Sequence, residues 1–242
     1  MKISAIVVSF QRAEAITHFH ENRRRAGVEY DELIWVDNGS TDGMAAVCRS
    51  TSADVFVLNK HNIGCAQGFN RGFAMATGDW LINPGINCIG PQGWLKAMKE
   101  VAATGEVDAV CMYSSDPLTI PERIMGPAKV IGGHRVAPSM AFETCLFKKE
   151  LLERIGWYRE DLGLYGWYDV EWGDRCRFHK VNSVALLDLQ KTRAELGPMT
   201  IRVNGEEVDY RAWRDAEIAD TQKHAVLQVV ADQKWPNYKP YK

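Results

Sequence analysis

The N-terminal part of the sequence alternates between short apolar segments and longer segments with helical periodicity, and no other feature says as much about the fold. The apolar segments are residues 3–9, 32–36, 54–58 and 80–82, and the helical patterns cover residues 13–26, 67–76 and 91–103. Short continuous apolar runs are typical of parallel strands that are covered on both faces. We therefore predict an α/β fold, a Rossmann-like, mostly parallel sheet with helices on both faces.

The alternation ends after a strand predicted at residues 107–113. A stretch rich in proline and glycine follows at residues 117–138, and such stretches in compact domains are often binding loops or lids. Further along we predict a strand at 142–147, helices at 148–155, 167–179 and 210–230, a turn at Gly197-Pro198 and a hairpin across Asn204-Gly205. No boundary is evident before about residue 190. We predict one domain over residues 1–190 and a small C-terminal helical extension, residues 191–242, packed on it.

Composition sets outer limits on this picture. A chain of 242 residues can bury roughly 70% of its unfolded surface in one core. Lys and Arg total 29 against 31 Asp and Glu, so no overall field attracts polyanions. No run approaches the ~18 apolar residues of a membrane span, so we expect a soluble protein. Six widely spaced cysteines without a CxxC pair indicate reduced thiols and a cytoplasmic protein: Cys48, Cys65, Cys88, Cys111, Cys145 and Cys176.

Four motifs place polar and glycine residues at the ends of predicted strands or on a predicted helix. They are Ser9-Phe10-Gln11-Arg12; Val36-Asp-Asn-Gly-Ser-Thr-Asp42; Asn62-x-Gly64 with Asn70-x-Gly72 and Ala76-Thr-Gly-Asp79; and Arg154-Ile-Gly-Trp-Tyr-Arg-Glu160 with Trp167-Tyr-Asp-Val-Glu-Trp-Gly-Asp-Arg175. The carboxyl ends of parallel strands are where α/β sheets bind nucleotides. Taken in order, the motifs resemble the GT-A fold of the family 2 glycosyltransferases, which move a sugar from a nucleotide diphosphate to an acceptor hydroxyl.

The resemblance implies a nucleotide-sugar site, with UDP as the expected nucleotide. Its candidate residues are Ser9, Phe10, Arg12, Asp37, Asn38, Asn62, Arg71, Asn83 and Gly85. Asp37 follows an apolar strand and can accept hydrogen bonds from a base or ribose, although Asp at the end of a strand also caps turns. Phe10 can lie against the base. Arg12 or Arg71 can bind phosphate, because a guanidinium pairs with two phosphate oxygens.

For catalysis the resemblance implies Asp169 as the general base and inversion at the sugar, since the acceptor attacks from the face opposite the leaving diphosphate. An Asp with a reference pKa of ~3.9 is charged at neutral pH, as a base must be. Glu171 either assists or pairs with Arg175 at i+4. The candidate acceptor-binding residues are Glu143, Trp167 and Glu171.

The acceptor itself is left open between a glycan or small molecule and a modified nucleic-acid base. The segment Gln233–Lys242 interleaves three Lys with three aromatic residues and contains no acid. Aromatic side chains and cations together can bind single-stranded nucleic acid. A tail of this kind can equally pack along its own domain.

The sequence departs from the family pattern where a metal is expected. Asn83-Pro84-Gly85 stands in the place of an Asp-x-Asp motif, and Tyr168 replaces the acid before Asp169. Hard cations such as Mn²⁺ and Mg²⁺ favour carboxylate and carbonyl oxygens, so a divalent metal is not assigned. Three interpretations follow: metal-independent transfer aided by Lys60, Arg71, Arg175 or Arg177; a rebuilt metal site using Glu195, Asn83 or Asn87; or a catalytically silent protein that binds a nucleotide sugar or a glycan.

Overall fold

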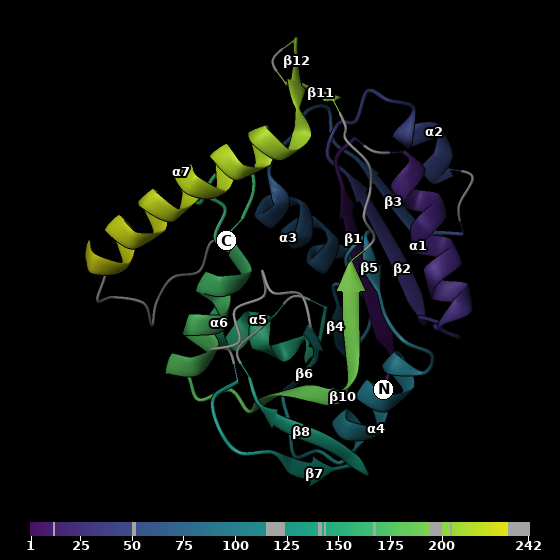
Figure 1. Cartoon of the computed structure of the whole chain (residues 1–242), viewed down its shortest axis with the longest axis vertical. Helices are drawn as coiled ribbons and strands as arrows, with labels where there is room; N and C mark the ends of the chain where they lie inside the picture. Colours follow the sequence, from purple (N-terminus) through teal and green to yellow (C-terminus); the bar gives the residue numbers. More distant parts are fainter. Residues whose placement is uncertain are drawn as a thin grey trace.

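The computed structural model describes residues 1–11, 13–49, 52–114, 124–139, 142, 144–166, 168–193, 200–203 and 205–231. The strands are β1 (Ile3–Ser9), β2 (Glu32–Asp37), β3 (Val55–Leu58), β4 (Trp80–Ile82), β5 (Cys88–Ile89), β6 (Ala109–Ser114), β7 (Lys129–Ile131), β8 (His134–Pro138), β9 (Cys145–Lys148), β10 (Ser183–Arg193), β11 (Thr200–Val203) and β12 (Glu206–Asp209). The helices are α1 (Glu14–Arg25), α2 (Met44–Arg49), α3 (Cys65–Met75), α4 (Trp94–Ala103), α5 (Glu150–Ile155), α6 (Tyr168–Phe178) and α7 (Tyr210–Ala231). Figure 1 shows their arrangement.

The central sheet has the strand order β3-β2-β1-β4-β9-β6-β10-β8-β7. β3, β2, β1 and β4 run parallel, and so do β6 and β10. β9 lies antiparallel between β4 and β6, while β8 and β7 extend the sheet beyond β10 in antiparallel pairing. The predicted α/β fold with a mostly parallel central sheet is confirmed.

Helices cover both faces of β1, which explains its apolar sequence. Ile3, Ala5 and Val7 belong to one hydrophobic cluster with residues of α1 and α4. Ile6 belongs to a second cluster with residues of α3, α5 and α6. Successive side chains of a strand point to opposite faces, so this division follows directly from strand geometry. Each buried Ile or Val contributes about 1.5–3 kcal/mol to folding, which holds β1 at the centre of the sheet.

Two glycines of α3 allow this helix to lie close to β1. A Cβ atom at Gly68 would lie 2.8 Å from Cγ1 of Val8, and one at Gly72 would collide with the side chain of Ile6. Both glycines therefore serve the contact between helix and sheet. The contact holds the N-terminus of α3, the positive end of its dipole, near the carboxyl end of β1.

The loop predicted at residues 117–138 is partly wrong. Residues 115–123 lie outside the described residues, but β7 and β8 pair as an antiparallel hairpin. Gly132 and Gly133 form its turn with φ angles of 58° and 83°. Two consecutive positive φ angles suit the tight hairpin turns that glycine favours. Three further elements, α2, β5 and β10, were not predicted from the sequence.

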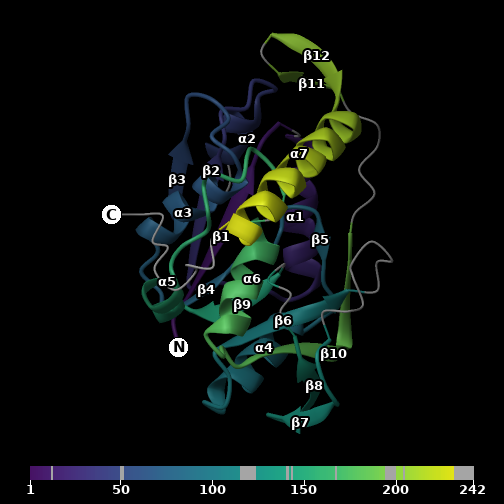
Figure 2. The same cartoon turned by 90° about the vertical axis from the view of Figure 1, so that its left-hand side faces the viewer.

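The C-terminal elements agree with the sequence. β11 and β12 pair across Asn204-Gly205, and α7 follows directly. Figure 2 shows this hairpin projecting beyond the sheet, and in Figure 1 α7 runs from it past α3 to the left-hand edge of the molecule. The turn at Gly197-Pro198 lies outside the described residues. β10 continues without interruption through residue 190, so the boundary predicted there falls inside a strand.

Within the part of the chain that the structure describes, no helix combines the length and apolar character needed to cross a bilayer.

Candidate active site

A pocket of about 160 Å³ lies at the carboxyl ends of β1, β2 and β4, between α3, the start of α6 and the start of α7. Its wall contains Val8, Ser9, Phe10, Gln11, Asn38, Asn62, Cys65, Phe69, Asn83, Gly85, Ile86, Asn87, Leu164, Tyr165, Tyr168, Tyr210 and Trp213. All four sequence motifs contribute to it or lie beside it. Six of the candidate donor residues line it: Ser9, Phe10, Asn38, Asn62, Asn83 and Gly85. Arg12 lies outside the described residues.

Asp37 organises the turn beside the pocket from a buried position. It is only 1% exposed, and its carboxylate accepts hydrogen bonds from the Ser40 hydroxyl (2.5 Å) and backbone N–H (3.1 Å). The Ser9 hydroxyl donates to it as well, at 3.4 Å. Burial raises the pKa of Asp37, although the hydrogen bonds from Ser40 and Ser9 oppose that rise. The carboxylate therefore caps its own turn, one of the two roles left open by the sequence.

The first two motifs are locked together behind Phe10. The backbone N–H of Gln11 donates to the Ser40 hydroxyl at 2.7 Å, and the side-chain oxygen of Gln11 accepts from the N–H of Thr41 at 3.1 Å. Asp42 accepts from the N–H groups of Ala13 and Met44, at the starts of α1 and α2. These bonds fix the backbone on both sides of the phenyl ring.

Asn38 lies on the pocket wall, but both ends of its amide are used within the protein. Its Nδ2 donates to the carbonyl of Gly64 at 3.0 Å, and its Oδ1 accepts from Asn59 at 2.8 Å. Asn59 in turn accepts a hydrogen bond from Arg71, whose side chain is exposed and contributes nothing to the pocket wall. The structure thus does not bring Arg71 to the site as the phosphate ligand that the sequence predicted.

Asn62 shapes the N-terminus of α3. Its Oδ1 accepts from the N–H of Gly64 at 3.0 Å, and Gly64 precedes the helix with a φ of 91°. The next N–H, that of Cys65, donates to the carbonyl of Leu164 at 2.9 Å. This bond ties α3 to the loop before α6, and both segments line the pocket.

The segment that replaces the metal motif is held by hydrogen bonds to a distant segment. The Nδ2 of Asn83 donates to the carbonyl of Phe142 at 2.9 Å, and its Oδ1 accepts from the N–H of Cys145 at 2.9 Å. Gly85 has no side chain to offer a metal, and Asn87 lines the pocket. In the described residues, no group of three or more His, Cys, Asp or Glu side chains is arranged to hold a metal ion. Both ends of the Asn83 amide are occupied by backbone groups of Phe142 and Cys145, so Asn83 does not fit the role of a metal ligand. Glu195 lies outside the described residues.

A buried lysine that the sequence analysis did not single out lies behind this segment. β10 shifts register between Leu186 and Lys191 and then pairs with β5. Lys191 is 3% exposed, and its Nζ donates to the Thr144 hydroxyl at 3.2 Å. That hydroxyl donates to the carbonyl of Pro84 at 3.4 Å. A positive charge is thereby brought close to the position where the family pattern places a metal.

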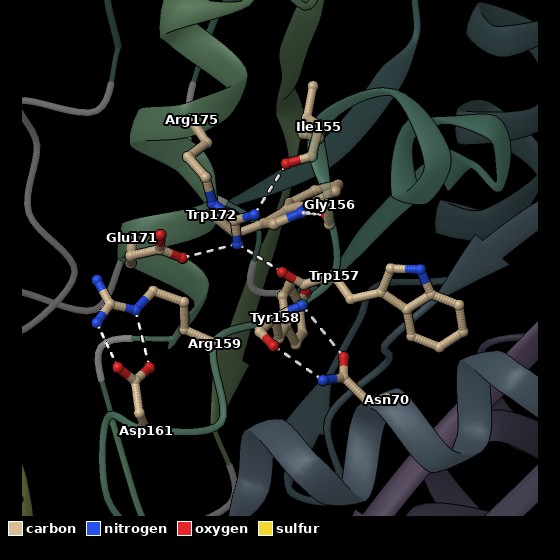
Figure 3. Close-up of polar contacts among 10 residues, drawn as sticks. All are labelled: Asn70, Ile155, Gly156, Trp157, Tyr158, Arg159, Asp161, Glu171, Trp172 and Arg175. Atoms are coloured by element: carbon tan, nitrogen blue, oxygen red, sulfur yellow. Dashed lines mark hydrogen bonds and ion pairs between the residues drawn. The ribbon is translucent and has the colours of Figure 1, made fainter. Parts of the chain in front are cut away.

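The buried side of α6 carries an ion pair rather than a binding surface (Figure 3). Glu171 and Arg175 have side chains 3% and 0% exposed and lie 2.8 Å apart. Arg175 also donates to the carbonyls of Ile155 (2.8 Å) and Trp157 (2.6 Å). Burial raises the pKa of Glu171, and the guanidinium of Arg175 opposes this. The i+4 pairing is confirmed. The Glu171 carboxylate faces the interior, and the structure does not bring it to the pocket as the acceptor-binding residue that the sequence predicted.

Further polar contacts in Figure 3 tie both α3 and α6 to the segment between α5 and α6. The side chain of Asn70 donates to the carbonyl of Tyr158 at 2.8 Å and accepts from its N–H at 3.1 Å. The indole of Trp172 donates to the carbonyl of Gly156 at 2.8 Å. The motif around residues 154–160 is therefore a scaffold.

The remaining cations proposed for the leaving group are also placed elsewhere, since Arg177 is exposed beside Asp174 and Lys60 is exposed.

Asp169 lies in the first turn of α6, half buried, next to residues of the pocket wall. Burial, and then the negative charge of Asp169, raise the pKa of the Cys65 thiol to about 12. The same carboxylate contributes to the raised pKa of Tyr168, whose largest cause is again burial. Both Cys65 and Tyr168 line the pocket, and Asp169 follows Tyr168 directly in the chain. The positive end of the helix dipole there favours its charged form. Glu143 and Trp167 lie outside the described residues.

α7 adds an aromatic wall that the sequence analysis did not predict. The ring of Trp213 lies 5.9 Å from Phe10, 6.4 Å from Tyr165 and 5.9 Å from Tyr210, measured between ring centroids. All four rings line the pocket. Spacing of Tyr210 and Trp213 on one helical face was the available signal, since residues three apart share a face.

The sequence matches the family model described as "Glycosyl transferase family 2" over residues 4–116. That range begins in β1 and includes the first three sequence motifs. A search of curated proteins gave no match. The family model bears out the resemblance to family 2 glycosyltransferases over this range, and the solved structures that follow bear out the fold.

Two solved structures illustrate the shared fold. "Mannosyltransferase PcManGT from Pyrobaculum calidifontis in complex with GDP-Man and Mn2+" superposes with a TM-score of 0.68 at 21% identity, covering 96% of this chain and 65% of that one. "S. aureus TarS 1-349 in complex with UDP-GlcNAc" superposes with a TM-score of 0.63 at 14% identity, covering 81% of this chain and 60% of that one. At such identities the likeness concerns the fold, and this chain spans less than two thirds of the length of either protein.

Proposed function

We propose that this chain, a glycosyltransferase of the family 2 type with a GT-A fold, transfers a sugar from a UDP-linked donor to an acceptor hydroxyl with inversion. The observation that carries the proposal is the place of Asp169. Asp169 follows Tyr168, which lines a pocket built at the carboxyl ends of the parallel strands by the motifs that carry the family resemblance. A base must be within reach of the acceptor hydroxyl and must be charged, and the first turn of a helix favours that charge.

In this reaction the acceptor hydroxyl loses its proton to the Asp169 carboxylate as its oxygen attacks the anomeric carbon. The bond from that carbon to the diphosphate breaks on the opposite face, and UDP leaves with the bonding electrons. Attack and departure on opposite faces invert the configuration. The acceptor is a glycan, a small molecule or a modified nucleic-acid base, and the tail Gln233–Lys242 that raised the last alternative lies outside the described residues.

We propose that transfer does not require a divalent metal. Asn83 is engaged by Phe142 and Cys145, and Gly85 offers no side-chain ligand. Two features can stabilise the charge of the leaving diphosphate instead: the N-terminus of α3 and the buried Lys191 behind Pro84. The five cysteines whose side chains are described are all free, which supports a protein that works in the reducing cytoplasm.

The first test measures donor binding by isothermal titration with UDP, GDP and CDP, in EDTA and then with added Mn²⁺. We expect UDP to bind with micromolar affinity in EDTA and Mn²⁺ to change this by less than about threefold. Binding of UDP that appears only with Mn²⁺ would overturn the metal-independent mechanism. Preference for GDP would overturn the choice of nucleotide.

The second test measures turnover as the release of UDP from UDP-sugars, with water in place of the unidentified acceptor. Proton NMR identifies the anomer of the released sugar. Asp169→Asn should lower turnover by about 10²–10⁴-fold and leave UDP affinity unchanged. Asp174→Asn is the matched control, because Asp174 is an exposed acid on the same helix. Equal turnover in the Asp169 variant would show that the base is another group.

A catalytically silent binding protein is the second candidate, favoured by Tyr168 and Gly85 at positions where the family pattern has acids. It predicts UDP binding without release of UDP from any UDP-sugar, whatever metal is present. Turnover that depends on Asp169 would exclude it.

A further inference from the structure

The indole N–H of Trp213 is buried in the pocket wall without a hydrogen-bond partner. Its Nε1 has almost no solvent-accessible surface and reaches no acceptor in the described part of the chain. Buried donors in folded proteins are nearly always paired, so an orphaned donor requires an explanation. The N–H also belongs to a residue that lines the candidate donor pocket. A bound molecule that reaches the indole through a small movement of the ring or of the segment covering it would supply that partner.

The surroundings of Trp213 show why the donor is positioned rather than merely enclosed. Phe10 at the end of β1, Tyr165 before α6 and Tyr210 at the start of α7 all lie within 6.4 Å of the indole, measured between ring centroids. Three segments far apart in sequence therefore meet on one ring. Contacts with three other rings restrict the orientations open to the indole, and therefore the directions from which an acceptor can approach its N–H.

A glycine fixes the approach of α7 to this cluster. Gly166 has a φ of +91°, and a Cβ atom there would lie 3.0 Å from Cγ1 and 3.6 Å from Cα of Ile218 on α7. The positive φ and the tight contact both favour glycine at this position. The loop before α6 and the helix that carries Trp213 are thus packed directly on each other.

The character of the pocket indicates which part of a donor it takes. None of the side chains that form its described wall is charged, and six of them are aromatic: Phe10, Phe69, Tyr165, Tyr168, Tyr210 and Trp213. Its volume of about 160 Å³ is below the ~300–1,000 Å³ typical of pockets for whole drug-sized ligands. A neutral, aromatic and small pocket suits a planar base better than a diphosphate.

We propose that Trp213 is a specificity-determining residue of the donor site, whose indole N–H donates a hydrogen bond to a carbonyl oxygen of the uracil base. The inference rests on the proposed function, because it takes UDP as the nucleotide. Phe10 packs against the base in the same assignment. The C-terminal extension then completes the nucleotide site instead of only covering the domain.

The test follows the eight tryptophan indole N–H signals by ¹⁵N–¹H NMR while uridine and then UDP are added to the full chain. The signal that is missing in Trp213→Phe identifies Trp213. We expect this signal to move downfield with uridine as well as with UDP, because the base alone makes the contact. The indole of Trp172, which donates to the Gly156 carbonyl, is the internal control and should not move.

Affinities provide the second readout. Trp213→Phe keeps an aromatic ring and removes the donor together with one of the two fused rings, so uridine and UDP should each bind about threefold to tenfold more weakly by the same factor. The melting temperature should stay within about 2 °C of the parent, since the N–H has no partner in the unliganded protein. Equal affinities of Trp213→Phe and the parent would overturn the inference.

The outcomes separate this inference from the function on which it rests. If amide signals of Ser9, Phe10 and Gln11 move with UDP and the Trp213 indole does not, the donor site stands and the role of Trp213 is wrong. If UDP and uridine move no signal at any position, the UDP site is wrong, and the assignment of Trp213 to a uracil base fails with it.

Discussion

Removing the guanidinium of Arg175 should destabilise the packing of α6 and lower the free energy of unfolding. Arg175 donates to Glu171, Ile155 and Trp157 from a fully buried position. In Arg175→Met the Glu171 carboxylate loses its counter-charge in the interior, and breaking a buried pair in this way costs about 3–5 kcal/mol. Urea unfolding followed by circular dichroism measures the loss. Arg177→Met, which removes an exposed ion pair on the same helix, should cost about 0–1 kcal/mol. Similar losses for the two variants would contradict the structure of this pair.

Single residues differ in how far their sequence neighbours reveal their roles. Glu171 and Arg175 are four apart on a predicted helix, so their pairing follows from helical geometry. Asn83 bonds to groups 59 and 62 residues away, and nothing near it in the sequence indicates them. Its position in the motif suggested a metal ligand, whereas its contacts show that it joins its own segment to the backbone of Phe142 and Cys145. The orphaned N–H of Trp213 could not be predicted either, because it depends on three segments meeting in space.

Among the elements, the ends of β6, β9 and β10 are joined by one carboxylate, Asp108. It accepts from Lys148 Nζ at 2.9 Å and from the N–H of Asn182 at 3.1 Å. Burial by itself would raise its pKa, but the hydrogen bonds from Lys148 and Asn182 and the charges of Lys148 and Arg154 outweigh burial and lower it. A lowered pKa means that the folded state favours the charged carboxylate.

This carboxylate should make stability depend on pH in one direction. Its contribution is present above the unfolded pKa of ~3.9 and is lost as the pH falls through the lower folded value. Asp108→Asn should therefore lose about 1–2 kcal/mol at pH 7, a figure reduced for partial exposure, and the gap to the parent should narrow as the pH falls below the unfolded value. Urea midpoints of both proteins at pH 7, 5 and 3 test this. A gap that stays constant across this range would rule out the assigned role.

The elements that the sequence predicted well are those whose pattern is local. β1, α3 and the β11–β12 hairpin depend on apolar runs, helical spacing and an Asn-Gly turn, and each is found as expected. The β7–β8 hairpin was taken for a loop because Gly132-Gly133 was read as a break and not as a hairpin turn. β10 was missed because it pairs with β6 on both sides of a register shift and with β5 only at its end, a combination of distant partners that leaves no local pattern.

For the molecule as a whole, the arrangement of the core suggests where the domain ends. The described hydrophobic clusters reach no further along the chain than Leu189, and the buried Ile201 belongs to neither of them. Since β10 continues past residue 190, we propose that the α/β domain includes all of β10 and that the extension begins after it. The extension then contributes to the site through Tyr210 and Trp213 while the core folds without it.

A chain shortened to residues 1–199 should accordingly fold but bind nucleotide poorly. Both clusters remain intact in it, so we expect one cooperative urea transition with a midpoint within about 0.5 M of the parent. The slope m, which follows the surface exposed on unfolding, should fall only slightly. Phe10 and Tyr165 lose the Trp213 ring, so UDP should bind at least as weakly as in Trp213→Phe. Urea unfolding and UDP titration on the same preparation measure both. A shortened chain that unfolds without a cooperative transition would show that the extension belongs to the folding unit, whereas unchanged UDP affinity would show that α7 closes the pocket without taking part in binding.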